Sequence, residues 1–487
     1  MEVSDSRVVS NSLFIYAGRV INLVFNFFIF VYLANYLGES AFGRFSIAIT
    51  YVGTFDIIAN FGLNQILVRE LAGGRTEKSR LLGNGILLKG VITLLALACA
   101  LAILPFMAYP RETMVVVWII LVNLIVSSKL SSTRTVFESI FQAQLRMAFP
   151  ILCNILDNLL FVLLIFLAAH FFNAGLTGMA LIYGLCNLPG TFWLVGRFLR
   201  TNQVSWQPQW PVLRELLRES LPLAFYLFFS ILTTKIDVLM LSWMRNEAEV
   251  GQYAAATRLV YPLSFLSTSL TISLFPLLSK SFHERREEFD RLCRRGSKYV
   301  FLIGLFTSGV LAFAADPIIR TLYVPGYAAC IPAFRLLLIS LGFSFLNFYF
   351  IDILISARRQ KLVTGVMALA FAVNLLLNLL LIPALGIAGA GYAKLGSTVT
   401  AFLFLFMVLR WQLKISRLLP YARIVLLTAA FLLTLGLMRE LNLPLYLLLS
   451  VVIFVLFLRA FTIFTYEERE KFTNLITGLL KKRSRRT

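Results

Sequence analysis

The stretch SLFIYAGRVINLVFNFFIFVYLANYL at residues 12–37 contains a single charged side chain, Arg19. A hydrocarbon layer about 30 Å thick is crossed by roughly 20 residues of α-helix, because each residue adds about 1.5 Å. The stretch is therefore long enough to span a membrane. It is also longer than the apolar core of a secretory signal peptide, and no small-residue cleavage site follows it at Gly38-Glu39. We expect a membrane helix that is retained in the protein.

Similar apolar runs follow along the whole chain. In a first block the predicted spans are 12–37, 44–67, 83–108, 114–138, 149–172 and 176–198. In a second block they are 220–243, 252–279, 298–319, 332–356, 362–383 and 387–409, and the runs 421–438 and 442–464 complete the series. A membrane β-strand needs only about ten residues of alternating polarity, and none of these runs alternates. The sequence predicts an all-α integral membrane protein with fourteen transmembrane helices.

The composition agrees with this class and excludes others. Of the 487 residues, 59% are hydrophobic and 14% are charged, whereas soluble domains are usually about half apolar and about a quarter charged. Five cysteines and two histidines argue against a disulfide-framed secreted domain and against a His/Cys metal centre. The sequence contains no nucleotide-binding loop, nucleophile triad or metal motif. We predict a protein that is not an enzyme and has neither a cofactor nor a metal.

The net charge of +21 is distributed unevenly between the predicted helices. Basic residues, Arg134 among them, gather in every second connection, at 69–80, 134–146, 197–218, 280–298, 358–361 and 410–423. By the positive-inside rule these connections and both termini are cytoplasmic, so we expect a multi-pass protein of the plasma (inner) membrane. The basic residues lack the interleaved aromatic side chains of nucleic-acid-binding surfaces. No nucleic-acid partner is expected.

The second block repeats the first. Phe42-Gly43-Arg44 aligns with Val250-Gly251-Gln252, Gly175-Leu176-Thr177-Gly178 aligns with Gly386-Ile387-Ala388-Gly389, and a looser match relates 142–146 to 356–360. Three matches in register predict two six-helix lobes related by a pseudo-two-fold axis along the membrane normal, with a cavity between them. This is the architecture of an alternating-access transporter.

The repeat predicts domain boundaries. The lobes occupy 1–200 and 220–412 and are joined by a cytoplasmic linker at 201–219. Helices thirteen and fourteen lie within 413–464, and a basic cytoplasmic tail fills 465–487. The lysines and arginines of this tail would attract anionic lipid headgroups with about 1 kcal/mol per residue. A tail that is simply solvated is the plainer alternative.

Several short stretches carry a family resemblance. They are VGQYAAATRL at 250–259, YVPGYA at 323–328, NLLLNLLLIP at 374–383 and GIAGA at 386–390, with further matches at 36–43 and 61–70. They resemble the polysaccharide-biosynthesis flippases, the O-antigen-flippase-like members of the superfamily that also contains the multidrug extruders and the lipid II flippase. The resemblance implies a V-shaped pair of lobes that moves a polyprenyl-pyrophosphate-linked oligosaccharide from the inner to the outer leaflet. It also implies a polysaccharide polymerase and chain-length machinery as partners.

Basic residues inside the predicted spans are candidates for function, because a charge near the bilayer centre costs at least about 2.5–3.5 kcal/mol. Lys235, Arg258 and Lys394 fall at similar heights in the outer half of the second lobe, and Arg19 lies in the first helix. We predict that these four side chains line a cationic cavity, where they pair with the phosphate groups of the substrate. Snorkelling or an internal ion pair is the alternative for each of them.

Four carboxylates also lie within the spans: Asp56, Asp157, Asp237 and Asp352. Each could carry a proton or bind Na⁺ and so couple transport to an ion gradient, or it could form a structural ion pair. Polar stripes accompany them at Asn22, Asn26, Asn154, Asn158, Asn374 and Asn378. For these amides hydrogen bonding between helices is the first expectation, and contact with sugar is the second.

Rival functions come from the same superfamily and from a different class. A cation-coupled multidrug extruder typically has twelve helices and a more apolar or acidic cavity, so two extra helices and a cationic interior favour the flippase. A lipid II-type flippase is a second alternative. A membrane glycosyltransferase would need acidic catalytic residues and usually a large outward loop, whereas the first outward connection covers only 38–43.

Overall fold

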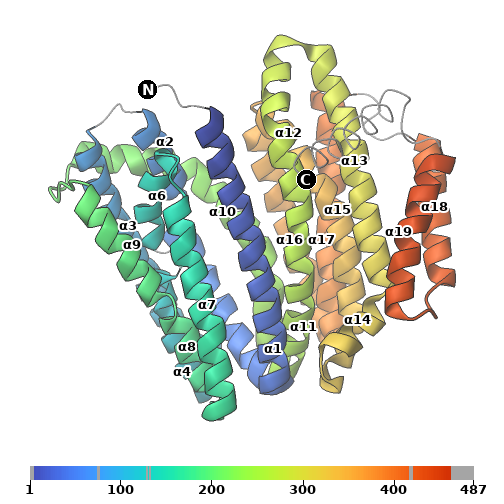
Figure 1. Cartoon of the computed structure of the whole chain (residues 1–487), viewed down its shortest axis with the longest axis horizontal. Coiled ribbons are helices and arrows are strands. Elements are labelled where there is room, and N and C mark those ends of the chain that lie inside the picture. The colour runs from blue at the N-terminus through green and yellow to red at the C-terminus, as the bar shows by residue number, and fades with distance from the viewer. Residues whose placement is uncertain (1–4, 74–76, 128–129, 131–132, 416–420, 462–487) are drawn as a thin grey trace, which may run out of the picture. The chain divides into compact units, whose positions relative to one another are not determined.

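The computed structural model describes residues 5–73, 77–127, 130, 133–415 and 421–461, and every regular element in these ranges is a helix (Figure 1). Eleven of the described helices are long and apolar enough to cross a membrane. This confirms the predicted all-α membrane fold. The predicted count of fourteen is not confirmed, because two predicted spans merge into one helix, a third is broken, and a fourth, 421–438, is short. The predicted tail at 465–487 lies outside the described residues.

The first two predicted spans merge into α1 (Asp5–Asn60), a run of 56 residues that is interrupted only at Gly38. Gly38 has φ 75° and ψ 170°, a backbone conformation that is open almost exclusively to glycine. The interruption lies in the predicted first connection, 38–43. The chain therefore changes direction there through one residue, without a separate loop.

The fourth predicted span, 114–138, is not one helix. It consists of α4 (Arg111–Leu121), the single turn α5 (Asn123–Val126) and α6 (Arg134–Ala143). Hydroxyl groups satisfy carbonyls that the break leaves without helical partners: Thr133 Oγ1 donates to the Ile125 oxygen at 2.5 Å, and Thr191 Oγ1 donates to the Val126 oxygen at 2.8 Å. Serine and threonine compete for backbone groups in this way, so they weaken helices.

The chain forms two compact units, comprising 1–263, 319–337 and 360–401 in the first and 264–318, 338–359 and 402–487 in the second. The boundary at 263/264 differs from the predicted linker at 201–219, so the lobe boundaries stay a prediction. The helices wholly in the first unit, besides α1 and α4–α6, are α2 (Leu63–Gly73), α3 (Lys78–Ile103), α7 (Ala148–Phe171), α8 (Leu176–Leu185), α9 (Leu188–Thr201), α10 (Trp210–Met244), α11 (Glu247–Val260) and α16 (Gln360–Leu385). Within it α1 packs against α7, α10 and α11, and α10 packs against α16.

The second unit contains α12 (Ser264–Glu284), α13 (Arg286–Phe313), α18 (Tyr421–Leu437) and α19 (Leu443–Ala460). The helices α14 (Ala315–Leu322), α15 (Ile331–Ser356) and α17 (Ile387–Gln412) each contribute residues to both units. In the second unit α13, α18 and α19 share an apolar core around Phe431 and Leu435. The Tyr446 hydroxyl donates to the Val310 oxygen at 3.0 Å within this core.

Candidate substrate cavity

A cavity of about 350 Å³ lies within the first compact unit. Its lining comes from α1, α7, α8, α10, α11 and the segment between α5 and α6, through Asn22, Asn26, Phe30, Ile49, Leu130, Asn154, Asn158, Tyr183, Lys235 and Arg258. Helices from both predicted repeats therefore contribute to one site. A volume of this size is at the lower end of the range for small-molecule pockets.

Two of the four predicted binding cations line this cavity together. Lys235 comes from α10 and Arg258 from the end of α11. The Arg258 guanidinium carbon lies 3.8 Å from the centre of the Phe30 ring, a cation–π contact that orients the guanidinium plane. Lys235 and Arg258 also repel one another electrostatically. Two like charges held in one partly enclosed space favour the binding of an anion.

The other two predicted binding cations differ in position. Lys394 does not appear among the residues that line the cavity, and its Nζ donates to the Thr233 oxygen at 2.5 Å and lies 3.9 Å from Asp237 Oδ2. Arg19 lies on α1, three residues before the cavity-lining Asn22, and its side chain is outside the described part of the structure. The structure thus brings together Lys235 and Arg258 and pairs Lys394 with a carboxylate.

Asp237, two residues from Lys235, is fully buried in a polar cluster of its own. Its Oδ1 accepts a hydrogen bond from Asn378 Nδ2 at 2.9 Å, and its Oδ2 accepts one from the Tyr253 hydroxyl at 3.2 Å. Lys394 supplies the opposite charge. A buried carboxylate with two hydrogen bonds and a cation is the arrangement of a structural ion pair, which was the alternative stated for each of these residues.

Asp157 forms a similar buried ion pair, with Arg134. Both Asp157 and Arg134 have fully buried side chains, and Arg134 Nη1 donates to Asp157 Oδ2 at 2.5 Å. Asp157 Oδ1 accepts from the backbone N–H of Gly190, near the start of α9, at 2.9 Å. Arg134, which the charge pattern counts among the basic residues around the fourth connection, is buried among packed helices and is not exposed in a loop. It begins α6 and anchors α7 and α9.

Asp56 is the carboxylate that acts electrostatically on a cavity cation. It lies buried on α1, where it attracts the ammonium groups of both Lys235 and Lys89. Lys89 is fully buried on α3 and donates from Nζ to the Ala59 oxygen. Asp352 belongs to the second compact unit, where its side chain hydrogen-bonds with Thr271.

A close helix crossing joins repeat-equivalent positions of α1 and α11. A Cβ atom at Gly43 would overlap the Glu247 carbonyl oxygen, and a Cβ atom at Gly251 would overlap the Glu39 carbonyl oxygen. The flanking side chains pair reciprocally as well: Arg44 Nε lies 2.5 Å from Glu247 Oε2, and Gln252 Nε2 donates to the Glu39 carboxylate. Such reciprocity is expected where a two-fold axis passes between two equivalent segments.

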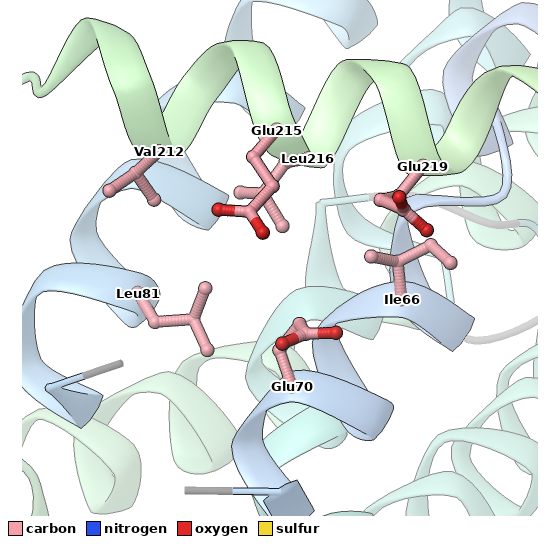
Figure 2. Close-up of a pocket in the computed structure, with 7 residues that line it drawn as sticks. All are labelled: Ile66, Glu70, Leu81, Val212, Glu215, Leu216 and Glu219. Atoms are coloured by element: carbon pink, nitrogen blue, oxygen red, sulfur yellow. The ribbon is translucent and has the colours of Figure 1, made fainter. Parts of the chain in front are cut away.

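A second hollow lies between α2, α3 and α10, and Figure 2 shows the carboxylates of Glu70, Glu215 and Glu219 around it. Its volume is about 10 Å³, which is room for about one water molecule. Arg69 Nη2 lies 2.7 Å from Glu70 Oε1 and 3.2 Å from Glu219 Oε2 and so offsets part of the negative charge. The hollow is too small to hold a transported substrate.

Comparisons with known proteins identify relatives of the chain. The family model described as "Polysaccharide biosynthesis protein" matches residues 8–282, and the MatE model matches residues 222–380. An uncharacterized membrane protein of Methanocaldococcus jannaschii is 24% identical over 420 residues, which cover 79% of each chain.

Solved transporters share the fold. The inward closed lipid II flippase MurJ superposes with a TM-score of 0.74 at 15% identity, covering 93% of this chain and 98% of that one. An inward-facing multidrug resistance MATE family transporter superposes with a TM-score of 0.63 at 14% identity, covering 82% and 95%. The chain belongs to the polysaccharide biosynthesis protein family, has helices long and apolar enough to cross a membrane several times, and shares its fold with the flippase MurJ and with MATE transporters.

Proposed function

We propose that the protein moves a polyprenyl-(pyro)phosphate-linked oligosaccharide from the cytoplasmic to the outer leaflet by alternating access, for surface polysaccharide biosynthesis. The observation that carries the proposal is that Lys235 and Arg258 line the same cavity, with no carboxylate among the described residues that line it. A transporter of lipophilic cations would repel its own substrate at such a site. Family membership and the fold shared with a lipid II flippase support the proposal.

The physical task is to carry phosphate charge across a layer of low dielectric constant. Moving an ion out of water costs several kcal/mol even after the surrounding protein relaxes. Lys235 and Arg258 replace part of the lost hydration with charge-assisted hydrogen bonds, which are shorter and stronger than bonds between neutral groups. The guanidinium presents its donors in a fixed fork that matches phosphate oxygens, and the Phe30 ring holds that fork in place.

Asp56 is our candidate for coupling transport to H⁺ or Na⁺. Its negative charge attracts Lys235, so protonation of Asp56, or Na⁺ beside it, would leave the ammonium group freer to hold a phosphate. The reverse change would weaken phosphate binding and favour release. Asp157 and Asp237 are less suited to this role, because buried cations already pair with them.

Alternating access requires that the path can close at either end. The crossing of Gly43 and Gly251 lies just after the interruption of α1 at Gly38 and near the start of α11, in a region that the charge pattern predicts to face outward. We propose that this crossing is the outer closure. We also propose a plasma-membrane location with both termini cytoplasmic, contact of the tail with anionic lipid, and cooperation with a polymerase and chain-length machinery.

A leaflet assay tests the proposal. Full-length protein is reconstituted in vesicles with a fluorescent polyprenyl-diphosphate-linked sugar, and loss of probe from the inner leaflet is measured with a membrane-impermeant quencher. Lys235→Ala and Arg258→Ala are each expected to abolish movement, whereas Lys280→Ala, an exposed lysine of α12, retains it. Full movement by both cavity variants would overturn the assignment of the site.

The rival extruder makes the opposite prediction in the same vesicles. A multidrug transporter would move lipophilic cations and leave the diphosphate probe in place. Transport of such a cation by the wild-type protein, together with unchanged positions of the diphosphate probe, would favour that alternative.

A further inference from the structure

Four of the residues that line the cavity are asparagines. Asn22 and Asn26 on α1 and Asn154 and Asn158 on α7 all line the cavity. On each helix the two asparagines are four residues apart, so they lie on one face. Lys235 and Arg258 come from the other two main helices, α10 and α11. The site thus has an amide wall, these four asparagines, and a cationic wall.

Defined hydrogen bonds hold the amide wall in place. Asn158 Nδ2 donates to Asn22 Oδ1 at 2.7 Å, and Asn26 Nδ2 donates to the backbone oxygen of Asn22 at 2.6 Å. Asn154 Oδ1 accepts from Arg134 Nη2 at 2.7 Å, and Arg134 is itself held by a buried ion pair. Groups fixed in this way lose little conformational entropy when they bind a ligand.

In three of these side-chain amides, one polar group has no hydrogen-bond partner in the described part of the chain. These groups are the Asn22 Nδ2 donor and the Oδ1 acceptors of Asn26 and Asn158. Sugar hydroxyls both donate and accept hydrogen bonds, so a wall that presents both kinds of group suits them. A carboxylate wall would present acceptors alone and would also repel the neighbouring phosphate.

We propose that the amide wall binds the sugar attached directly to the (pyro)phosphate, while Lys235 and Arg258 hold the phosphate. This rests on the proposed function and deepens it. A cavity of about 350 Å³ is too small for a whole oligosaccharide but suits a phosphate group and an adjacent ring. The wall makes the transporter selective for a loaded carrier over the bare polyprenyl (pyro)phosphate, which carries the same charge and lacks the hydroxyls.

Binding of two probes by the full chain in lipid nanodiscs tests the proposal. The probes are farnesyl diphosphate and farnesyl-diphosphate-linked N-acetylglucosamine, and their Kd values are measured by calorimetry. The wild-type protein is expected to bind the sugar-bearing probe at least about tenfold more tightly, because a few net hydrogen bonds of this strength amount to such a factor.

Two variants remove the wall with little structural cost. Asn26→Leu deletes an amide whose hydrogen bond to described residues is to its own helix, at the Asn22 backbone oxygen. The double variant Asn22→Leu/Asn158→Leu removes both partners of one hydrogen bond, so that neither is left orphaned. Both should bring the Kd ratio of the two probes toward one while the Kd for farnesyl diphosphate stays within about twofold. Asn202→Leu, outside the cavity, is the matched control and should keep the wild-type ratio.

The outcomes separate the two levels of the proposal. Equal wild-type affinity for the probes, or a ratio that the leucine variants do not change, overturns the sugar assignment and leaves the proposed function standing. Equal loss of both probes together with a lower unfolding temperature also overturns it, because the asparagines would then act only as structural contacts. If the wild-type protein binds neither probe, the proposed function itself fails.

Discussion

Replacement of Asp157 by Asn separates a structural ion pair from an ion-coupling carboxylate. The substitution keeps the shape of the side chain and removes the charge that faces Arg134, whose guanidinium is fully buried. Breaking a buried pair by removing one partner usually costs about 3–5 kcal/mol, because the other charge stays behind uncompensated. Glu138, 3.3 Å from Arg134 Nε, offsets part of that loss. We expect a loss of about 3 kcal/mol in the free energy of unfolding.

The measurement is reversible unfolding of the purified protein in mixed micelles, compared with the double variant Arg134→Met/Asp157→Leu. Replacing a buried pair with apolar residues of similar volume is often neutral or stabilising, so the double variant should be more stable than Asp157→Asn. Wild-type stability in Asp157→Asn, combined with loss of transport, would refute the structural assignment and favour ion coupling at Asp157.

Three further predictions concern other buried contacts. Gly43→Leu should push α1 and α11 apart where Gly43 meets Glu247. A cysteine placed in the cavity should then react faster with a labelling reagent added from the outer side. An unchanged labelling rate would contradict an outer closure at this point. Lys394→Met should destabilise the protein by about 3 kcal/mol, with partial recovery when Asp237→Asn is added, and an additive loss would show that the two residues are not coupled. Gly38→Ala should cost about 1–3 kcal/mol because of its backbone angles, and unchanged thermal unfolding would contradict that conformation.

The class of fold could be predicted because membrane insertion depends on the length of apolar runs, which can be counted in the sequence. A run such as 12–37 must bury about 20 apolar residues in lipid whatever its tertiary partners are. The position of a break within such a run depends also on contacts from elsewhere in the chain. The fourth span breaks where the Thr191 hydroxyl, from α9, bonds the Val126 oxygen, and nothing local to the span specifies that bond.

Candidate residues could be predicted, but not their pairing. The cost of a charge within the membrane singled out Lys235, Arg258 and Lys394 alike. Only the folded structure shows that Lys394, on α17, lies against Thr233 and Asp237 of α10 and is not among the residues that line the cavity. Arg134 was not singled out as a structural residue because the charge pattern counted it with the basic residues of the connection 134–146. The repeat was more informative, since it aligned Gly43 with Gly251, and these two glycines meet.

The most direct test of the central claim is the position of the phosphate groups in the cavity. A cryo-EM structure of the full chain in nanodiscs with farnesyl-diphosphate-linked N-acetylglucosamine should show the diphosphate between Lys235 Nζ and the Arg258 guanidinium, with N⁺···O⁻ distances of about 2.7–2.9 Å. Density for the diphosphate elsewhere in the protein, with both side chains left facing an empty cavity, would contradict the account.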